Sequence, residues 1–310
     1  MLSRISFSKT PLVPFKLTKT ITVKCLSTSE ILVPLKLSFA AYETPSETNK
    51  GNPFVILHGL FGSKQNWTSL SKAFHQKTSP QRKVIAIDLR NHGDSPHNKD
   101  HTYGHLAADL RQFLQDHDLQ KIALMGHSMG GRCAMLFALK YPELVERLIV
   151  VDISPAATSP NLNELPKLFD ILSNIKLPSN VPLSQARAVV DQQLAEYIAD
   201  KSLRAFLLTN LIETDNQKYK WRINIPSLTS NFQSIARFPN VGDLKYLGDT
   251  LFIGGEKSDF IAKSDYPKIL KLFPKAQLKY IEGAGHWVHS EKPNEFLKLT
   301  LDFLNRASSA

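Results

Sequence analysis

The chain has 310 residues, of which 42% are hydrophobic and 21% charged, a balance that is typical of a folded globular protein and excludes a disordered one. Its two cysteines exclude a disulfide scaffold and a cysteine-rich zinc module, and no apolar run approaches the roughly 18 residues of a transmembrane helix. The 38 basic and 28 acidic residues leave a net charge of +10, which raises the question of a nucleic-acid or anionic-membrane partner.

Half of this excess charge lies in residues 1–29, which we expect to be a mitochondrial transit peptide. The segment is rich in hydroxyl side chains and precedes the first acid, Glu30; its basic residues are Arg4, Lys9, Lys16, Lys19 and Lys24. Such a composition is typical of organellar presequences, and lysines and prolines break every apolar run that a secretory signal would need. The alternative is a disordered basic tail. The remaining 33 basic and 28 acidic residues give +5, so we expect mitochondrial localisation, the import machinery as a partner through the leader, and no nucleic acid.

After the leader, short apolar runs alternate with longer amphipathic stretches. Five continuous runs are typical of parallel strands buried on both faces; they span residues 54–57, 84–88, 122–125, 148–151 and 251–253. Apolar residues at helical spacing predict helices over Asn66–Phe74, Tyr103–Leu114 and Met129–Leu139. The alternation predicts an α/β fold with a mostly parallel, doubly wound sheet that binds its ligands at the carboxyl ends of the strands.

Residues 155–240 interrupt this alternation. They contain no convincing buried strand but four amphipathic segments separated by prolines: Leu162–Ile175, Ser184–Ile198, Ser202–Ile212 and Leu228–Ile235. The strand pattern resumes at Thr250. We therefore expect residues 155–240 to form a helical cap over the strand ends, inserted between two parts of one α/β core, residues 30–154 and 241–310.

A G-x-S-x-G sequence, Gly126-His127-Ser128-Met129-Gly130, follows the run at 122–125. The pattern alone is weak, but here it directly follows a predicted strand and directly precedes a predicted helix. That context is typical of a nucleophile elbow, a turn so sharp that only glycine fits on either side of it. The turn presents the serine hydroxyl at the positive end of the helix dipole. Ser128 is therefore the predicted nucleophile.

The base that activates such a serine follows it in the chain, where His286 and His289 are the two histidines available. His286 comes after an apolar run that ends at Ile281, on a loop whose glycines permit a close backbone approach. His289 is expected to face solvent or to cap the next segment. His286 is therefore the predicted base.

Two aspartates are candidates for the acid that orients the base. Asp152 directly ends the run at 148–151 and is followed by a short rigid exit that reaches Pro155. Asp259 lies some six residues beyond the next strand, in a looser loop. Both leave the sheet at the ligand-binding edge. We favour Asp152 and keep Asp259 as the alternative; the other aspartate would be a loop or helix-capping residue.

An oxyanion requires two backbone N–H groups that point at one position. Met129, the residue after the nucleophile, is expected to supply one. The loop after the run at 54–57 contains His58-Gly59-Leu60-Phe61-Gly62, and Leu60 is expected to supply the other.

Two further patterns predict neither a metal nor a phosphate site. Four histidines lie close together at His92, His97, His101 and His105. They span a polar loop and a helix start rather than one helix face, so we expect solvated or capping side chains. The pair Gly254-Gly255 lacks the length and the third glycine of a phosphate-binding loop.

Five segments together resemble the α/β-hydrolase superfamily, and within it the mitochondrial branch of yeast ethanol acetyltransferases and related α/β-hydrolase-domain esterases. They are residues 58–67, 88–97, 126–131, 151–155 and 285–287, and the resemblance extends from about Leu35 to the C-terminus. It implies acyl transfer through an acyl-serine, with Ser128, Asp152 and His286 as the triad.

The resemblance also implies an activity: alcohol acetyltransfer that makes ethyl acetate from acetyl-CoA and ethanol, with esterase and thioesterase side activity. Acetyl-CoA would then be an acyl-donor substrate, and no bound cofactor is expected. The alternative is a mitochondrial carboxylesterase or lipase-type serine hydrolase without useful transfer. A non-catalytic binding protein is a third hypothesis, against which the complete set of nucleophile, base and acid argues.

Overall fold

The computed structural model describes residues 32–44, 51–156, 159–215 and 218–306. The predicted transit peptide, residues 1–29, lies outside these described residues. Among the helices of the described segments, none is both long and apolar enough to cross a membrane.

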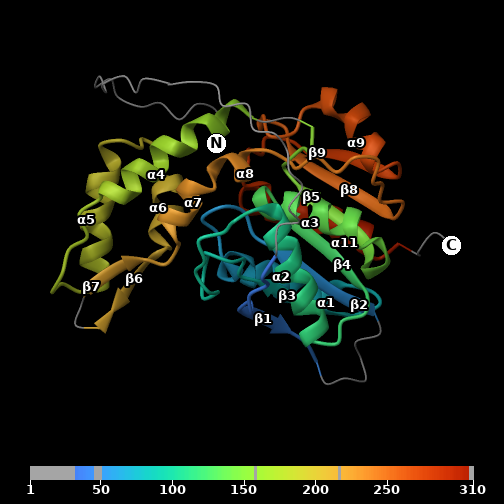
Figure 1. The fold of residues 1–310 in the computed structure, drawn as a ribbon, viewed down its shortest axis with the longest axis horizontal. Helices are drawn as coiled ribbons and strands as arrows, with labels where there is room; N and C mark the ends of the chain where they lie inside the picture. Colours follow the sequence, from blue (N-terminus) through green and yellow to red (C-terminus); the bar gives the residue numbers. More distant parts are fainter. Residues whose placement is uncertain (1–31, 45–50, 157–158, 216–217, 307–310) are drawn as a thin grey trace.

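A seven-stranded sheet forms the centre of the molecule, in the order β1-β3-β2-β4-β5-β8-β9 (Figure 1). Its strands are β1 (Phe39–Tyr42), β2 (Gly51–Leu57), β3 (Arg82–Ile87), β4 (Ile122–His127), β5 (Val145–Val151), β8 (Asp249–Gly255) and β9 (Ala276–Ile281). β1 runs antiparallel to β3, and the other pairings of this sheet are parallel. The predicted mostly parallel sheet is confirmed, and each of the five apolar runs lies in a strand, except that the run at 84–88 extends one residue beyond β3.

Helices cover both faces of the sheet (Figure 1). On one face lie α1 (Thr68–Lys77), the short α10 (Val288–Glu291) and α11 (Pro293–Leu304); on the other lie α2 (Tyr103–Asp116), α3 (Met129–Lys140) and α9 (Tyr266–Leu272). Strand side chains alternate between the two layers. In β2, Val55 and Leu57 pack into one apolar cluster, and Phe54 and Ile56 into the other. Because both layers are apolar, the strands appear in the sequence as continuous apolar runs.

The chain between β5 and β8 forms a separate group of elements beside the carboxyl ends of the strands (Figure 1). They are α4 (Leu165–Asn174), α5 (Leu183–Ala195), α6 (Lys201–Leu208), β6 (Leu211–Thr214), β7 (Lys218–Trp221), α7 (Ile225–Ser230) and α8 (Phe232–Ala236). We call this part of the chain the inserted segment.

The β6–β7 hairpin corrects the expectation that the inserted segment contains helices alone. α6 ends at Leu208, four residues before the end of the helix expected there, and the chain then turns into β6. The side-chain amide of Asn210 donates to the carbonyl oxygen of Phe61 (2.8 Å), which fixes this turn against the core. The hairpin is rich in β-branched and aromatic residues, which suit strand pairing: Ile212, Thr214, Tyr219 and Trp221.

Polar contacts fasten the end of the inserted segment to the loop after β3. The N–H of Asn224 donates to the carbonyl oxygen of Asn91 (3.0 Å), and its side chain donates to Asn91 Oδ1 (3.0 Å). Arg222 forms an ion pair with Asp94 (3.0 Å). The inserted segment is therefore fixed over the edge of the sheet where the predicted site residues emerge.

Candidate active site

Ser128 lies in a sharp turn between β4 and α3. Its backbone has φ 52° and ψ −117°, a left-handed conformation that costs a non-glycine residue on the order of 1–3 kcal/mol. A Cβ atom on Gly126 would lie 2.1 Å from the carbonyl oxygen of Gly130, and one on Gly130 would lie 2.5 Å from that of His58. Both motif glycines are therefore sterically required, and the strained turn holds the hydroxyl of Ser128 away from the strand.

Ser128, His286 and Asp152 form a chain of hydrogen bonds. Ser128 Oγ lies 3.1 Å from His286 Nε2, and His286 Nδ1 lies 2.7 Å from Asp152 Oδ2. The carboxylate accepts a hydrogen bond from the N–H at Nδ1 of His286. The other ring nitrogen, Nε2, therefore carries no hydrogen and can accept a hydrogen bond from the hydroxyl of Ser128. Asp152 is completely buried, while Ser128 and His286 retain 9% and 7% exposure toward the cavity.

The two candidate acids differ in their contacts. Asp152 follows β5 with a φ of 49°, and its Oδ1 accepts a hydrogen bond from the N–H of Gly255 (2.8 Å). Asp259 accepts a hydrogen bond from the hydroxyl of Ser159 (2.7 Å), a residue near the start of the inserted segment. The structure therefore brings Asp152, and not Asp259, into contact with His286.

Ser258 is a polar neighbour of Asp152 that the sequence analysis missed. Its hydroxyl donates to Asp152 Oδ2, the oxygen that also accepts from His286. Ser258 lies in the loop after β8, next to Asp259. Its position at the same edge of the sheet as Asp152 was the one feature of the sequence that could have indicated this contact. The contact holds the Asp152 carboxylate toward the imidazole and offsets part of its charge.

We expect Ser258→Ala to lower kcat by roughly 10- to 150-fold with little change in KM, because one charged hydrogen bond contributes roughly 1.5–3 kcal/mol. Ser258→Thr keeps the hydroxyl and is the matched control. An unchanged kcat in Ser258→Ala would show that the contact has no influence on the base.

The two predicted oxyanion donors come from two different segments next to Ser128. Met129 begins α3, where an N–H has no partner within the helix, and Leu60 lies in the loop after β2; both line the same cavity. This loop packs tightly on the elbow, since a Cβ on Gly59 would lie 3.2 Å from Ser128 Cβ. The N–H of Leu89 donates to His58 Nε2 (3.0 Å), which fixes the loop to the strand end of β3.

His127 and His289 connect the elbow to the loop that carries His286. His127 Nε2 lies 2.9 Å from the carbonyl oxygen of His286, so it donates to that carbonyl. His289 is buried and stacks on Trp67, with ring centroids 4.2 Å apart. The expectation that His289 faces solvent is therefore wrong, because the four-residue helix α10 turns its ring inward against Trp67, the residue before α1.

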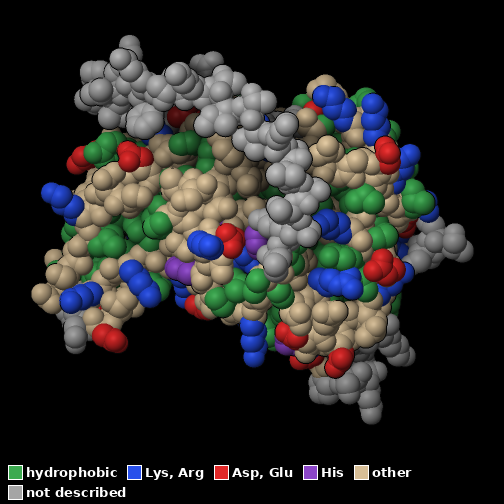
Figure 2. Space-filling model, viewed as in Figure 1, with side chains coloured by type: hydrophobic (Ala, Val, Ile, Leu, Met, Phe, Trp, Pro, Cys, Tyr) green, Lys and Arg blue, Asp and Glu red, His purple; other side chains and the backbone are tan. Residues whose placement is uncertain are grey.

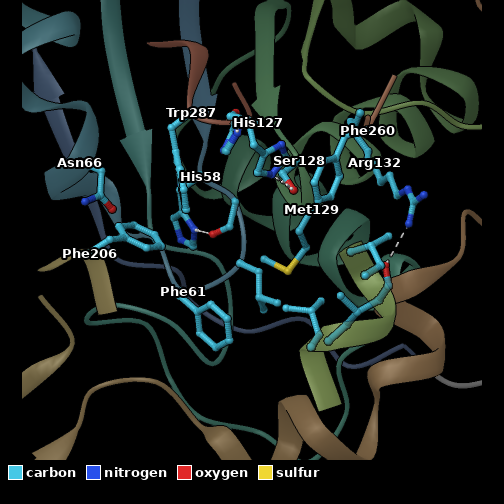
Figure 3. Close-up of a pocket in the computed structure, with 18 of the residues that line it drawn as sticks. His58, Phe61, Asn66, His127, Ser128, Met129, Arg132, Phe206, Phe260 and Trp287 are labelled. Atoms are coloured by element: carbon cyan, nitrogen blue, oxygen red, sulfur yellow. Dashed lines mark hydrogen bonds between the residues drawn. The ribbon is translucent and has the colours of Figure 1, made fainter. Parts of the chain in front are cut away.

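The site opens into a cavity between the sheet and the inserted segment. Its lining is predominantly apolar and includes Leu60, Phe61, Met129, Ile153, Leu162, Leu165, Leu168, Leu203, Phe206, Ile235, Phe260 and Trp287. Figure 3 shows Phe61, Phe206 and Phe260 around the space beside Ser128 and Met129. The aromatic and aliphatic walls can hold a hydrocarbon chain next to the hydroxyl of Ser128.

The expectation of solvated or capping histidines is wrong for His92 and His101, while the ring of His105 does contact Thr102, the N-cap residue of α2 (2.9 Å). His92, His101 and His105 are buried, and His97 alone is exposed. His101 Nδ1 lies 3.2 Å from Asn91 Nδ2, and His92 Nδ1 lies 3.0 Å from the carbonyl oxygen of Arg90. The inserted segment covers this loop, a tertiary contact that the local sequence does not reveal. No group of three side chains suited to a metal occurs among the described residues.

Burial disfavours the charged form of these rings. Loss of hydration lowers the pKa of His101 to about 3, helped by the charge of Arg90, and lowers the pKa of His289 to about 3, helped by His286. The pKa of His92 falls well below its usual 6.5 for the same reason, with His58 as the next cause. These rings are therefore neutral in the folded protein at neutral pH.

We expect the free energy of unfolding to fall as the pH decreases from about 6.5 toward 3. Above pH 6.5 neither state protonates these histidines; below it the unfolded chain takes up protons that the folded chain excludes. For His101 and His289 this costs up to about 2 kcal/mol each at pH 5. Urea unfolding at about pH 7.5 and 5 measures the loss, and His101→Gln should reduce its pH dependence. Equal stability at both pH values in the wild-type protein would contradict this expectation.

Comparison with known proteins identifies the family. A family model described as the alpha/beta hydrolase fold matches residues 52–293. The chain is 44% identical over 271 residues to the sn-1-specific diacylglycerol lipase ABHD11 of Danio rerio, which covers 87% of this chain and 83% of the relative. It is 34% identical over 296 residues to a probable alcohol acetyltransferase of Saccharomyces cerevisiae, which covers 88% of this chain and 84% of the relative.

A solved structure agrees with these matches. A marine microorganism esterase superposes with a TM-score of 0.79 at 37% identity, over 87% of this chain and 99% of the esterase. Sheet order, sequence and structural likeness thus lead to the same assignment. The chain belongs to the α/β hydrolase fold family and is a serine hydrolase of its lipase and esterase type.

Proposed function

We propose that the protein hydrolyses carboxylic esters of acyl lipids through an acyl-serine on Ser128, with His286 as the base and Asp152 as the orienting acid. The observation that carries this proposal is the hydrogen-bonded chain from Ser128 Oγ to Asp152 Oδ2 at the wall of an apolar cavity.

In this mechanism Ser128 Oγ attacks the ester carbonyl carbon while His286 Nε2 takes the hydroxyl proton. The negative charge moves to the carbonyl oxygen, where the N–H groups of Leu60 and Met129 stabilise it. The C–O bond to the alcohol then breaks, and His286 returns the proton to the departing oxygen. Water, deprotonated by His286, attacks the acyl-serine and releases the carboxylic acid.

The walls of the cavity favour a lipid as the ester. Among the described residues that line the cavity, Arg132 is the one Lys or Arg, and its guanidinium donates to the carbonyl oxygens of Ile235 (3.1 Å) and Ala236 (2.7 Å). An uncharged substrate with acyl chains suits such walls. Several relatives are named sn-1-specific diacylglycerol lipases, which makes diacylglycerol the first substrate to test.

Transfer of an acetyl group from acetyl-CoA to ethanol is the second candidate, favoured by the likeness to the probable yeast alcohol acetyltransferase. The same acyl-serine would form, with an alcohol in place of water as the acceptor. The phosphates of acetyl-CoA normally require cationic partners, and the guanidinium of Arg132 is already bonded to backbone carbonyls. The cavity lining therefore supports ester hydrolysis more strongly than transfer from coenzyme A.

One assay separates the two activities. Purified protein is given either diacylglycerol in detergent micelles or acetyl-CoA with excess ethanol, and fatty acid, monoacylglycerol, acetate and ethyl acetate are measured. Fatty acid release that disappears in Ser128→Ala supports the lipid esterase. Ethyl acetate formation without diacylglycerol cleavage would instead establish the transferase and overturn our first proposal.

We also propose that residues 155–240 act as a cap over the core formed by residues 30–154 and 241–310, and that residues 1–29 direct the protein to the mitochondrion. The cap proposal rests on the cavity-lining leucines of the inserted segment. The proposal of mitochondrial targeting rests on the basic, acid-free composition of residues 1–29. The targeting role of residues 1–29 can be tested with fluorescent fusions that contain or lack this segment. Mitochondrial location of both forms would refute the targeting role.

A further inference from the structure

Two leucines are exposed in the loop of residues 237–248, which connects α8 to β8. Leu244 is 43% and Leu247 63% exposed. Tyr246 between them is buried; its N–H donates to the carbonyl oxygen of Leu272 (2.9 Å) and its hydroxyl donates to that of Val145 (3.1 Å). This anchor holds the two leucines outward in a defined position.

Basic side chains surround Leu244. Lys245 and, on α9, Lys268 and Lys271 are exposed and line a shallow hollow with Leu244. Arg237 and Lys140 line a second hollow on the other side of Leu244. Asp243 is the one acidic residue among the described linings of both hollows. Figure 2 shows Lys and Arg side chains gathered over the α9 end of the molecule. We call this surface the Leu244 patch; it comprises Lys140, Arg237, Leu244, Lys245, Leu247, Lys268 and Lys271.

One end of the Leu244 patch lies beside the cavity, where the inserted segment joins the core. Its other end, at Leu247, lies just before β8, whose first residue pairs with Arg147 near the start of β5. Pro155, which lines one of the hollows, follows the cavity-lining Ile153 by two residues. On the other connection, Ile235 lines the cavity just before loop 237–248 begins. The hydrogen bonds from Arg132 to the carbonyl oxygens of Ile235 and Ala236 fix this connection to α3.

We propose that the Leu244 patch docks the enzyme on an anionic lipid bilayer, from which an acyl lipid enters the cavity. The substrate in this proposal, an acyl lipid, rests on the proposed function as a lipid esterase. A lipid ester with long acyl chains stays in the bilayer, so an enzyme with a buried apolar cavity must meet it there. The exposed side chains of Leu244 and Leu247 suit the acyl boundary of such a bilayer, and the basic side chains around Leu244 suit its anionic headgroups.

Insertion can be measured at the loop itself. Full-length Leu247→Trp is mixed with phosphatidylglycerol–phosphatidylcholine vesicles that carry brominated acyl chains, and quenching beyond that of the wild-type tryptophans is recorded. Tyr197→Trp is the matched control, because Tyr197 is exposed to a similar degree (46%) but lies after α5, outside the patch. We expect quenching in Leu247→Trp alone. Equal quenching at both positions, or none, would overturn the proposal. Residues 1–29 are the same in both variants and cannot produce a difference.

The charges are tested by vesicle cosedimentation. Each lysine near an anionic surface contributes a factor of about 5 to binding, so Lys268→Gln/Lys271→Gln should bind about 25-fold more weakly. Lys72→Gln/Lys77→Gln removes two exposed charges from α1, on the other face of the sheet, and should bind much as the wild type does. Both double variants should cleave a soluble p-nitrophenyl ester at the wild-type rate. Equal weakening in both would contradict a specific patch.

Further outcomes separate this proposal from the proposed function. Vesicle binding without cleavage of any glycerolipid ester supports docking and refutes the lipid esterase. Cleavage of diacylglycerol in micelles without vesicle binding refutes docking alone. A wild-type dimer that becomes monomeric in Leu247→Asp, with unchanged vesicle binding, would identify the patch as a contact between copies of this chain and overturn the proposal.

Discussion

Ser128→Ala should abolish ester hydrolysis, lowering kcat by a factor on the order of 10⁴ to 10⁶. The methyl group cannot attack a carbonyl, and His286 then has no hydroxyl to deprotonate. What activity remains would come from water that the N–H groups of Leu60 and Met129 assist. Release of p-nitrophenol from a soluble ester measures this effect without dependence on a membrane.

The fold should survive this substitution. Alanine adopts the strained turn at φ 52° no less easily than serine, and within the described part of the chain the hydroxyl hydrogen-bonds to His286 alone. The circular dichroism spectrum and Tm should therefore match those of the wild type. A fluorophosphonate probe should label the wild type and spare the variant. Unlabelled wild-type protein with normal Tm would favour the non-catalytic binding hypothesis.

Much of the fold follows from local patterns in the sequence. A strand that helices cover on both sides must be apolar on both faces, so each buried strand appears as one continuous run, as at 122–125 and 148–151. The elbow is equally local, because the glycines at 126 and 130 are required by atoms only a few residues away or in the adjacent loop.

The features that sequence analysis missed depend on contacts between distant segments. The turn after α6 is fixed by Phe61, some 150 residues earlier in the chain, so periodicity near Asn210 could not reveal where the helix ends. His101 is polar in sequence but buried beneath the inserted segment, where Asn91 also bonds to Ser227. The hydroxyl of Ser258 became relevant only when β5 and β8 were known to be neighbours.

Asp152→Asn should lower kcat by about 10⁴-fold, while Asp259→Asn should leave it within a few-fold of the wild type. The amide oxygen at residue 152 cannot stabilise the imidazolium that forms when His286 takes the proton. The amide NH₂ can also donate to Nδ1, which reverses the tautomer and removes the acceptor at Nε2. The pH profile of kcat/KM and the rate of fluorophosphonate labelling report both losses.

Asp259→Asn is the matched control for Asp152→Asn. Asp259 and Asp152 both follow strands at the same edge of the sheet, but Asp259 accepts a hydrogen bond from Ser159 in the inserted segment. Its substitution should therefore alter the attachment of that segment rather than the base. A rise in KM with little change in kcat would be the signature of that role. A 10⁴-fold loss of kcat in Asp259→Asn and a mild loss in Asp152→Asn would require that the loop after β8 moves during catalysis. In that case the hydrogen bond between Asp152 and His286 would belong to a resting arrangement of the site.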